Sequence, residues 1–416
     1  MEKGFTKRMV ESRVEKHLIK RNHPYYSMLD NFCFMSKNLY NHANYIVRNE
    51  FCKSGQWIKY GELDKLLRKD TERPDYKAMP TAQSAQQTLR LLDKNWKSFF
   101  ASIKDWSRNK DKYLGRPKLP KYKSKNGRNI LILTNQNVKL KSDNLLHFPK
   151  SFNGLIIKPK FVDRDNFVSF QQIRFIPHKN HIVAELVYNI KIPDTCLDGD
   201  RYIAIDIGVN NLATVCNNFY AQPFVINGKP VKSMNQYYNK KISHYRELAK
   251  RMNDMDFTKR MDSITNKRNR KIDDYMHKAS RIIINYCIEN KVTKIVIGNN
   301  KGWKRNSEMS KRVNQNFVQI PHMKFIKMIQ YKAKEYGIEV ILTEESYTSG
   351  TSFIDDEEPI KKNYNKDRRV HRGLFVSNDG IQINADLNGA YQIMKKVFPI
   401  KWNRGCVLHP IVVNVI

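Results

Sequence analysis

The spacing of apolar runs after residue 201 constrains the fold of this chain more than any other feature of its sequence. Three closely spaced runs, joined by pairs of asparagines, predict a meander of antiparallel strands at residues 202–209, 212–216 and 223–226. Two later runs, at 294–298 and 338–345, are separated by a helical pattern at 323–336 and predict two further strands. We therefore expect a mixed five-stranded sheet of the RNase H type, followed by a helix at 386–397.

The first 200 residues carry a different pattern. Residues 26–106 hold apolar side chains at helical spacing, which predicts several helices. Residues 130–191 contain short β-rich runs separated by turn residues, which predicts a small antiparallel barrel or sandwich. The chain is therefore expected to be a multidomain α+β protein.

A basic connector separates these two segments at residues 107–128. Nine of its 22 residues are Lys or Arg, one is acidic, and two prolines and two glycines disfavour regular structure. Tyr113 and Tyr122 interleave with the charges, so the connector could track a phosphate backbone and stack rings on bases. A solvated linker is the alternative interpretation.

The charge of the chain indicates a polyanionic partner. Lys and Arg number 75 against 40 Asp and Glu, a net charge of +35. This excess points to nucleic acid, with an unusually soluble basic enzyme as the alternative. A hydrophobic content of 40% excludes a disordered basic tail. The sequence has no apolar stretch long enough for a membrane span and no secretory signal at residues 1–8, so we expect a cytoplasmic, nucleoid-associated protein.

The six cysteines argue against a disulfide framework or a zinc site. They are scattered without a CxxC pair, which predicts reduced, buried thiols. No cysteine lies between Cys287 and Cys406, so a four-cysteine zinc site is excluded in that region.

Two acidic residues stand out from apolar surroundings. Asp206 lies in a predicted central strand whose alternation places Ala204, Asp206 and Gly208 on one face. A charge there is costly unless something compensates it, and its small neighbours leave room for a cation and a phosphodiester. Asp386 begins a helix in which Gly389 permits a close approach to the sheet. The alternatives are a strand-end cap for Asp206 and an interaction with the helix dipole for Asp386.

If Asp206 and Asp386 converge, divalent cations between them would relieve their repulsion. Two Mg²⁺ ions about 3.5–4 Å apart, with Mn²⁺ as the alternative metal, would permit two-metal hydrolysis of a phosphodiester. In such a site the metal ions activate water and stabilise the leaving oxygen. A third acidic residue normally completes the set. No zinc is expected.

Four short segments, in order along the chain, carry a resemblance to a known family. They are Gly115–Lys123, Asp206–Thr214, Glu345–Ser349 and Asn384–Tyr391. The chain resembles the TnpB family of transposon-encoded RNA-guided nucleases, the relatives of type V CRISPR effectors. The second and fourth segments resemble the first and third RuvC motifs of that family. The third resembles the segment that precedes its zinc ribbon, and the first resembles its proline-containing basic stretch.

The resemblance implies a domain order. A WED β-barrel is interrupted by a helical REC domain and is followed by a RuvC nuclease domain with the RNase H-like sheet. The implied parts are the first part of the barrel at 1–25, the REC domain and basic connector at 26–125, the rest of the barrel at 126–200, and the nuclease domain at 201–416. Two insertions are expected in the nuclease domain, a helical one at about 233–290 and a degenerate zinc-ribbon-like one at about 347–382.

The chain departs from the family at the middle catalytic glutamate. Family members carry it at the end of the fourth strand, where this chain has Gly298. The fifth predicted strand ends in Glu344 and Glu345, and a carboxylate there could reach the same site because the two strands are neighbours. We predict Glu345 as a relocated ligand with Glu344 as its rival, since adjacent strand residues face opposite ways. The predicted catalytic residues are Asp206, Glu345 and Asp386, which would hold Mg²⁺, and alternatively Glu344.

Further basic residues are candidates for contact with nucleic acid. Between residues 240 and 281 a helical pattern is rich in Lys and Arg, as in a heteroduplex channel or a solvated helical face. The individual residues predicted to bind nucleic acid are Arg116, Lys118, Lys121, Tyr122, Lys123, Lys301, Lys304, Arg305, Lys311 and Arg312.

With the resemblance, the sequence predicts a Mg²⁺-dependent, RNA-guided DNA endonuclease. Its partners would be a guide RNA and a double-stranded DNA target with a short flanking recognition motif, and no membrane. Gly298 motivates one alternative, a guided DNA-binding protein without nuclease activity. The other alternative is a DDE-type transposase without an RNA partner.

Overall fold

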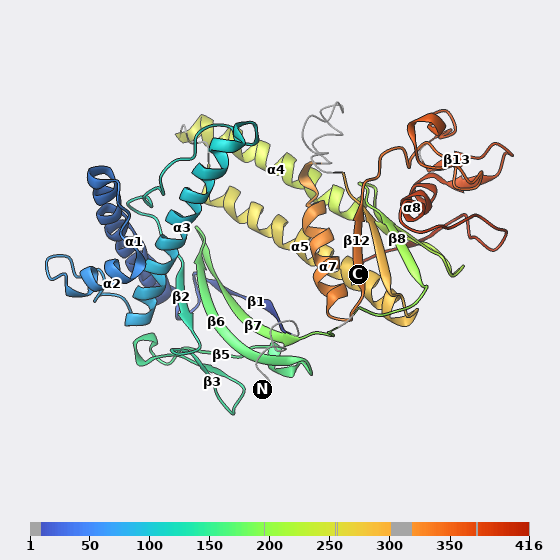
Figure 1. Cartoon of the computed structure of the whole chain (residues 1–416). Helices are drawn as coiled ribbons and strands as arrows, with labels where there is room; N and C mark the ends of the chain where they lie inside the picture. Colours follow the sequence, from blue (N-terminus) through green and yellow to red (C-terminus); the bar gives the residue numbers. More distant parts are fainter. Residues whose placement is uncertain are drawn as a thin grey trace. The chain divides into compact units, whose positions relative to one another are not determined.

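Figure 1 shows the computed structural model of the chain, which describes residues 10–194, 196–253, 255, 257–300, 318–371 and 373–415. The chain forms two compact units, Met1–Lys191 and Ile192–Ile416. Each unit has its own sheets and its own helices.

The first unit is built on a four-stranded antiparallel sheet in the order β1-β7-β6-β2. Its strands are β1 (Val10–Lys20), β2 (Leu131–Thr134), β6 (Phe167–Pro177) and β7 (His181–Lys191). Every second residue of β7 from Ile182 to Ile190 is buried, because successive side chains of a strand point to opposite faces. β1 pairs with β7 along its whole length, so strands from the two ends of the unit lie side by side.

Three helices are inserted between β1 and β2, as the helical spacing at 26–106 predicts. They are α1 (Tyr26–Ser54), α2 (Tyr60–Lys69) and α3 (Ala82–Arg108). α3 begins with a capping box, in which the side chains of Thr81 and Ser84 each accept a hydrogen bond from the other residue's backbone N–H. The buried Trp96 of α3 donates its indole N–H to Asn44 Oδ1 of α1 at 3.1 Å, which ties the two helices together.

The barrel implied by the resemblance is not what the described strands form. β1 and β2 are the two edges of the four-stranded sheet, so the sheet is open. β3 (Lys139–Leu140), β4 (Leu146–His147) and β5 (Ile156–Ile157) form a separate three-stranded sheet. α1 and α3 pack on the open sheet, where Cys33 of α1 contacts Phe175 of β6 and both are fully buried. A strand pattern cannot distinguish a face covered by helices from one covered by closure of the sheet.

The second unit contains a mixed six-stranded sheet in the order β12-β11-β8-β9-β10-β15. The strands are β8 (Tyr202–Asp206), β9 (Asn211–Asn217), β10 (Phe224–Asn227), β11 (Lys294–Gly298), β12 (Glu339–Thr343) and β15 (Ile411–Val413). The predicted antiparallel meander is confirmed, and so is the parallel placement of β11 and β12 beside β8. The count of five strands was wrong, because the short β15 adds itself parallel to β10.

Helices cover both faces of this sheet. α5 (Lys259–Glu289) and α7 (His322–Lys334) pack on one face, in a core that includes Ile203 and Ile205 of β8. α8 (Ala385–Lys395) packs on the other face, in a core that includes Ala204. The alternation predicted for β8 is therefore confirmed. It places Asp206, two residues after Ala204, on the face that α8 covers.

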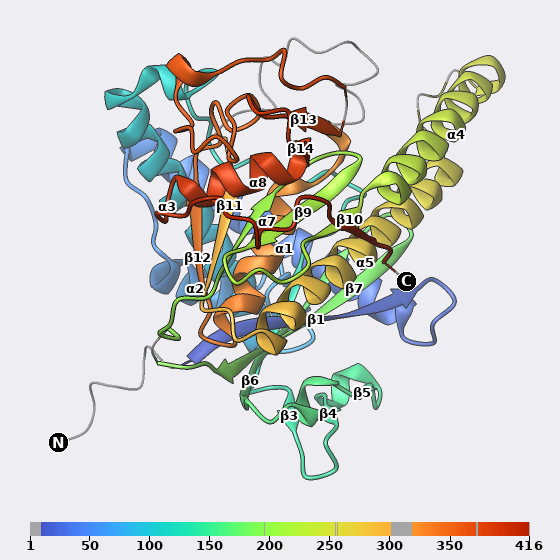
Figure 2. The same cartoon turned by 90° about the vertical axis from the view of Figure 1, so that its right-hand side faces the viewer.

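The helical stretch predicted from 234 to 289 is two helices, α4 (Lys229–Asn253) and α5, which lie side by side (Figure 2). Thr258 begins α5 by accepting a hydrogen bond from the Met261 N–H, and threonine at this position favours a new helix start. Among the helices within the described ranges, none is both long and apolar enough to cross a membrane.

The cysteines are all free thiols, but only three of the six are buried. Cys33, Cys216 and Cys287 lie in the cores, as predicted. Cys52 and Cys196 are exposed and Cys406 is half-buried, so the prediction of buried thiols was wrong for these three. Cys52 lies in the last turn of α1, and Cys196 lies in a polar segment that precedes β8 in the second unit.

Candidate functional site

Asp206 lies at the edge of the sheet where three parallel strands end. β8 ends at Asp206, β11 ends at Gly298, and β12 ends two residues before Glu345. α8 passes close to this edge, because a Cβ atom on Gly389 would lie only 3.2 Å from Asp206 Oδ2. The absence of a side chain at Gly389 thus permits the close approach that the sequence predicts.

Asp386 lies in the first turn of α8, where two partners hold its carboxylate. Asn384 caps the helix, since its side chain accepts hydrogen bonds from the N–H groups of Asp386 and Leu387. Arg369 Nη2 donates to Asp386 Oδ1 at 2.9 Å, and Asn211 Nδ2, at the start of β9, donates to Oδ2 at 2.7 Å. Asp386 is therefore a positioned anion beside the end of β8.

Glu344 and Glu345 face different surroundings. Glu345 is half-buried and forms a reciprocal pair with Asn300, whose Nδ2 donates to Oε1 and whose Oδ1 accepts from the Glu345 N–H, both at 3.1 Å. Glu344 is exposed and accepts a hydrogen bond from Ser346 Oγ. This geometry favours Glu345 over Glu344 as the acid that faces Asp206.

Gly298 leaves the space that the Glu345 carboxylate fills. A Cβ atom on Gly298 would lie 2.8 Å from Glu345 Oε2 and 2.7 Å from Ile393 Cδ1 of α8. These distances are too short for a side chain at 298 while Glu345 keeps its place. The glycine at the fourth strand and the glutamate after the fifth are therefore sterically complementary.

The carboxylates of the site interact electrostatically. Burial, followed by repulsion from Asp386 and Glu345, raises the pKa of Asp206 from 3.8 to about 8, against a smaller opposing effect of Arg369. Burial raises the pKa of Glu345 to about 7, although the nearby Lys396 ammonium lowers it. Three acidic side chains thus lie within one electrostatic neighbourhood in which negative charge is only partly compensated.

We expect the stability of the metal-free protein to fall between about pH 4 and pH 8. Over this range the folded chain keeps the proton on Asp206 that the unfolded chain has lost, because its folded pKa is about 8. Stability decreases with pH wherever the folded state binds more protons. Unfolding by urea in the presence of a chelator should show Asp206→Asn gaining roughly 2–5 kcal/mol relative to wild type between these pH values. A difference that does not change with pH would contradict this prediction.

The chemistry of these side chains fits a hard divalent cation, although their arrangement does not enclose one. Within the described ranges, no three His, Cys, Asp or Glu side chains are grouped so that they could hold a metal ion. Asp386 pairs with Arg369 instead. Carboxylate oxygens are nevertheless the ligands that Mg²⁺ prefers, and a cation would relieve the repulsion that, after burial, raises the pKa of Asp206. Binding of Mg²⁺ by Asp206, Glu345 and Asp386 stays a prediction, and it requires Arg369 to release Asp386.

The basic connector leads from the end of α3 towards β2 and has no regular strand or helix from 113 to 130, as its prolines and glycines predict. The side chains of Asn41 and Asn44 bind the backbone of Lys123 and Pro120 at 2.8–3.0 Å. Its predicted contact residues Arg116, Lys118, Lys121, Tyr122 and Lys123 are all exposed. The connector is therefore held against α1 by hydrogen bonds and is not a free linker, while its charged side chains face solvent. Lys301, Lys304, Arg305, Lys311 and Arg312 lie outside the described residues.

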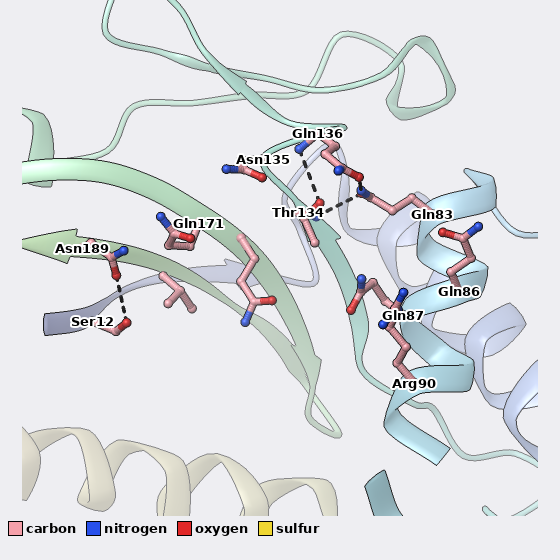
Figure 3. Close-up of a pocket in the computed structure, with 12 residues that line it drawn as sticks. Ser12, Gln83, Gln86, Gln87, Arg90, Thr134, Asn135, Gln136, Gln171 and Asn189 are labelled. Carbon is pink, nitrogen blue, oxygen red and sulfur yellow. Dashed lines mark hydrogen bonds between the residues drawn. The ribbon is translucent and has the colours of Figure 1, made fainter. Parts of the chain in front are cut away.

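A cleft in the first unit is lined almost entirely by polar side chains (Figure 3). It has a volume of about 570 Å³ and is lined by Ser12, Gln83, Gln86, Gln87, Arg90, Thr134, Asn135, Gln136, Gln171, Gln172, Val187 and Asn189. Gln83, Gln87 and Arg90 share one face of α3 because they are four and three residues apart. Gln83 is fixed by the strand opposite, since its Nε2 donates to Gln136 Oε1 at 2.6 Å and its Oε1 accepts from the Thr134 N–H at 3.2 Å. We call this the amide cleft.

The sequence interpretation missed the partners of the three carboxylates. Asn211, Asn300, Arg369 and Lys396 are common surface residue types, and each meets its acid only through the fold. A signal did exist for two of them, because Asn211 and Asn300 directly follow an asparagine at the end of a predicted strand or turn. The amide cleft was also missed, since its residues come from α3 and four different strands or their ends.

The chain has the multidomain α+β fold of a Cas12f1 effector. A solved structure of a Cas12f1–sgRNA–target DNA complex matches with a TM-score of 0.57 and 15% identity, over 88% of this chain and 82% of that chain. A structure of the mini RNA-guided endonuclease CRISPR-Cas_phi3 matches with a TM-score of 0.45 and 11% identity, over 97% of this chain and 94% of that chain.

Sequence comparisons point to a family within this class. A family model described as OrfB_IS605, probable transposase, matches residues 186–304, and one described as the Cas12f1-like TNB domain matches residues 322–393. The TnpB-like protein ORF457 of Acidianus two-tailed virus is 23% identical over 89% of this chain and 83% of its own length. The resemblance predicted from the motifs is confirmed: the chain is similar to a TnpB-like protein and matches the two family models over parts of its length.

Proposed function

We propose that this protein is an RNA-guided DNA endonuclease with a RuvC-type active site at the end of β8. The observation that carries the proposal is that Asp206, Glu345 and Asp386, from distant parts of the chain, lie around the end of β8. Gly389 brings α8 close to Asp206, and burial together with the charges of Asp386 and Glu345 raises the pKa of Asp206. Repulsion of this kind costs stability, and such perturbed groups cluster at functional sites.

Each side chain has a role in this proposal. Asp206, Glu345 and Asp386 would hold two Mg²⁺ ions, which when bound activate water and stabilise the leaving oxygen of the phosphodiester. Asn300 keeps the Glu345 carboxylate in place through its two hydrogen bonds. Asn211 orients Asp386, and Arg369 compensates its charge until the site is filled. Gly389 lets α8 carry Asp386 to the edge of the sheet.

Nucleic acids as partners are supported by charge and by the nature of the relatives. The net charge of +35 favours a polyanion. The Cas12f1 structure with the same fold is a complex with a single guide RNA and target DNA. We therefore assign guide RNA and target double-stranded DNA as partners, with the first unit in the place of the WED and REC domains and the second in that of the RuvC domain.

The amide cleft is the part of the first unit that suits recognition of a flanking DNA motif. A primary amide can donate and accept at once, and Asn or Gln pairs with both exposed major-groove atoms of adenine. Gln87 lies between the fixed Gln83 and Arg90 on one face of α3 (Figure 3). A motif containing A·T pairs is therefore the one that this cleft fits.

We expect Gln87→Ala to relax the flanking motif at one base pair. Loss of a paired amide should reduce discrimination there by about 5- to 100-fold, because one bidentate contact contributes about 1–3 kcal/mol. Cleavage of a library of targets with randomised flanking sequence measures this. Lys94→Ala, an exposed residue of the same helix outside the cleft, is the matched control. If Gln87→Ala cleaves targets with the same flanking motif as wild type, the amide cleft does not take part in recognising that motif.

One experiment tests the proposed function as a whole. RNA that copurifies with the full chain is sequenced, and DNA complementary to it is incubated with the complex in Mg²⁺. Cleavage of that DNA alone, abolished by EDTA, is the expected result. Target binding without cleavage would instead support a nuclease-inactive guided protein. Binding to transposon ends without any defined RNA would support a DDE-type transposase.

A further inference from the structure

A groove runs between α4 and α5 in the second unit, on the helical pair seen side by side in Figure 2. It has a volume of about 610 Å³. Its lining residues are Ser233, Met234, Tyr237, Tyr238, Lys241, Tyr245, Arg260, Ser263, Ile264, Lys267, Arg268 and Lys271. Three tyrosines and five cations thus line one cavity formed by two helices. We call it the tyrosine groove.

Aromatic rings and cations alternate along this groove. Lys241 Nζ lies 5.8 Å from the Tyr237 ring, and the Arg260 guanidinium lies 5.6 Å from the Tyr245 ring. Tyr237 is 64% exposed, although burial of an aromatic ring is normally favourable. An exposed ring beside a cation offers a stacking surface next to a site for a phosphate.

The cations of the groove lack compensation. Among its twelve described lining residues none is acidic. In the described part of the chain, Lys241, Arg260, Lys267 and Lys271 form no ion pair, in contrast to Lys278 and Lys324 further along, which pair with Asp274 and Asp273. Arg268 alone has a structural task, because it donates to Asn235 and to the Gln319 carbonyl. The other four are available for an external anion.

We infer that the tyrosine groove binds single-stranded RNA, with unpaired bases stacked on Tyr237 and Tyr245 and phosphates on the surrounding cations. A duplex does not fit this chemistry, since its bases are already stacked on each other and cannot offer their faces to the rings. The hydroxyls of Ser233 and Ser263 in the lining are suited to the ribose 2′-OH. The inference rests on the proposed function in one respect only, namely that RNA is a partner.

Binding of a fluorescein-labelled single-stranded RNA of about 12 nucleotides to the full chain tests the inference. Tyr237→Leu should weaken binding at least about five-fold, because stacking on one ring is worth that factor or more. Tyr237→Phe keeps the ring and should bind as wild type does. Lys241→Gln should weaken binding more than Lys240→Gln, which removes the same charge from an exposed neighbour outside the groove. RNA carrying 4-thiouridine should crosslink to Tyr237 or Tyr245.

Three results would overturn the inference. They are an unchanged affinity of Tyr237→Leu, equal effects of Lys240→Gln and Lys241→Gln, and equally tight binding of DNA or duplex RNA of the same sequence. The proposed function fails separately. If the groove variants weaken RNA binding but no complementary DNA is cut, the groove assignment stands and the nuclease assignment does not. If guided cleavage occurs while every groove variant binds RNA as wild type does, the nuclease assignment stands and the groove assignment does not.

Discussion

Asp206→Asn should abolish DNA cleavage while the protein still binds its RNA and its complementary DNA. The substitution keeps the size of the side chain but removes the charge that would hold a metal ion on the central strand. Loss of a metal-ion contribution of several kcal/mol corresponds to a decrease in rate of at least about 10³-fold. The variant should fold well, since burial already disfavours the charged form of Asp206 and raises its pKa to about 8.

A control substitution just before the same strand separates this effect from a general one. Asp200 lies before the opposite end of β8, is exposed, and accepts a hydrogen bond from the Tyr202 hydroxyl. Asp200→Asn should therefore cleave at the wild-type rate. Cleavage rate and target binding are measured on the same preparations, with RNA content determined for each. Persisting cleavage by Asp206→Asn, with Mg²⁺ still required, would show that the active site lies elsewhere.

The sheet of the second unit could be predicted because local patterns determine most of it. The meander of β8, β9 and β10 follows from short apolar runs with turn residues between them, and the helices between later strands require parallel pairing. β15 could not be predicted, because only its pairing with β10 distinguishes three apolar residues from a loop. The open sheet of the first unit is a similar case. The packing of α1 and α3 on this sheet determines that it stays open, and no local sequence pattern indicates that packing.

The acids of the site differ in how far the sequence could place them. Asp206 could be singled out because a charge in an apolar strand requires compensation, and Asp386 because Gly389 allows its helix to come close. Their catalytic role stays a prediction. Glu345 was separated from Glu344 only by the structure, through the contact with Asn300. Arg369 could not be found, since its distance from Asp386 along the chain gives no sign of contact, and the asparagine pair that includes Asn211 does not indicate which acid Asn211 would contact.

Loss of the third acid should also reduce cleavage strongly, though less than loss of Asp206. Glu345→Gly should reduce cleavage by about 10²- to 10³-fold, whereas Glu344→Gln should leave it unchanged because Glu344 is exposed and paired with Ser346. Gly298→Glu should also be inactive, and less stable by about 1–3 kcal/mol, because the new side chain overlaps the Glu345 carboxylate and Ile393. Cleavage rates and thermal unfolding of the three variants measure these effects. Full activity of Glu345→Gly would show that Glu345 is not the third acid and would leave Glu344 as the candidate for that role.

The double variant Gly298→Glu with Glu345→Gly should recover part of what each single change destroys. Removing the Glu345 side chain empties the space in which a Cβ on Gly298 would lie 2.8 Å from Oε2, leaving only the flexible end of Ile393 to adjust. A carboxylate from the end of β11 would then enter the same pocket beside Asp206, since β11 and β8 are neighbouring parallel strands. Stability should rise above that of Gly298→Glu, and cleavage above that of Glu345→Gly, so the two changes are strongly non-additive.

Gly298→Gln with Glu345→Gly is the matched control: it has the same shape without the charge, and should regain stability without cleavage. If the glutamate and glutamine versions cut DNA equally, the acid at this place has no part in the reaction.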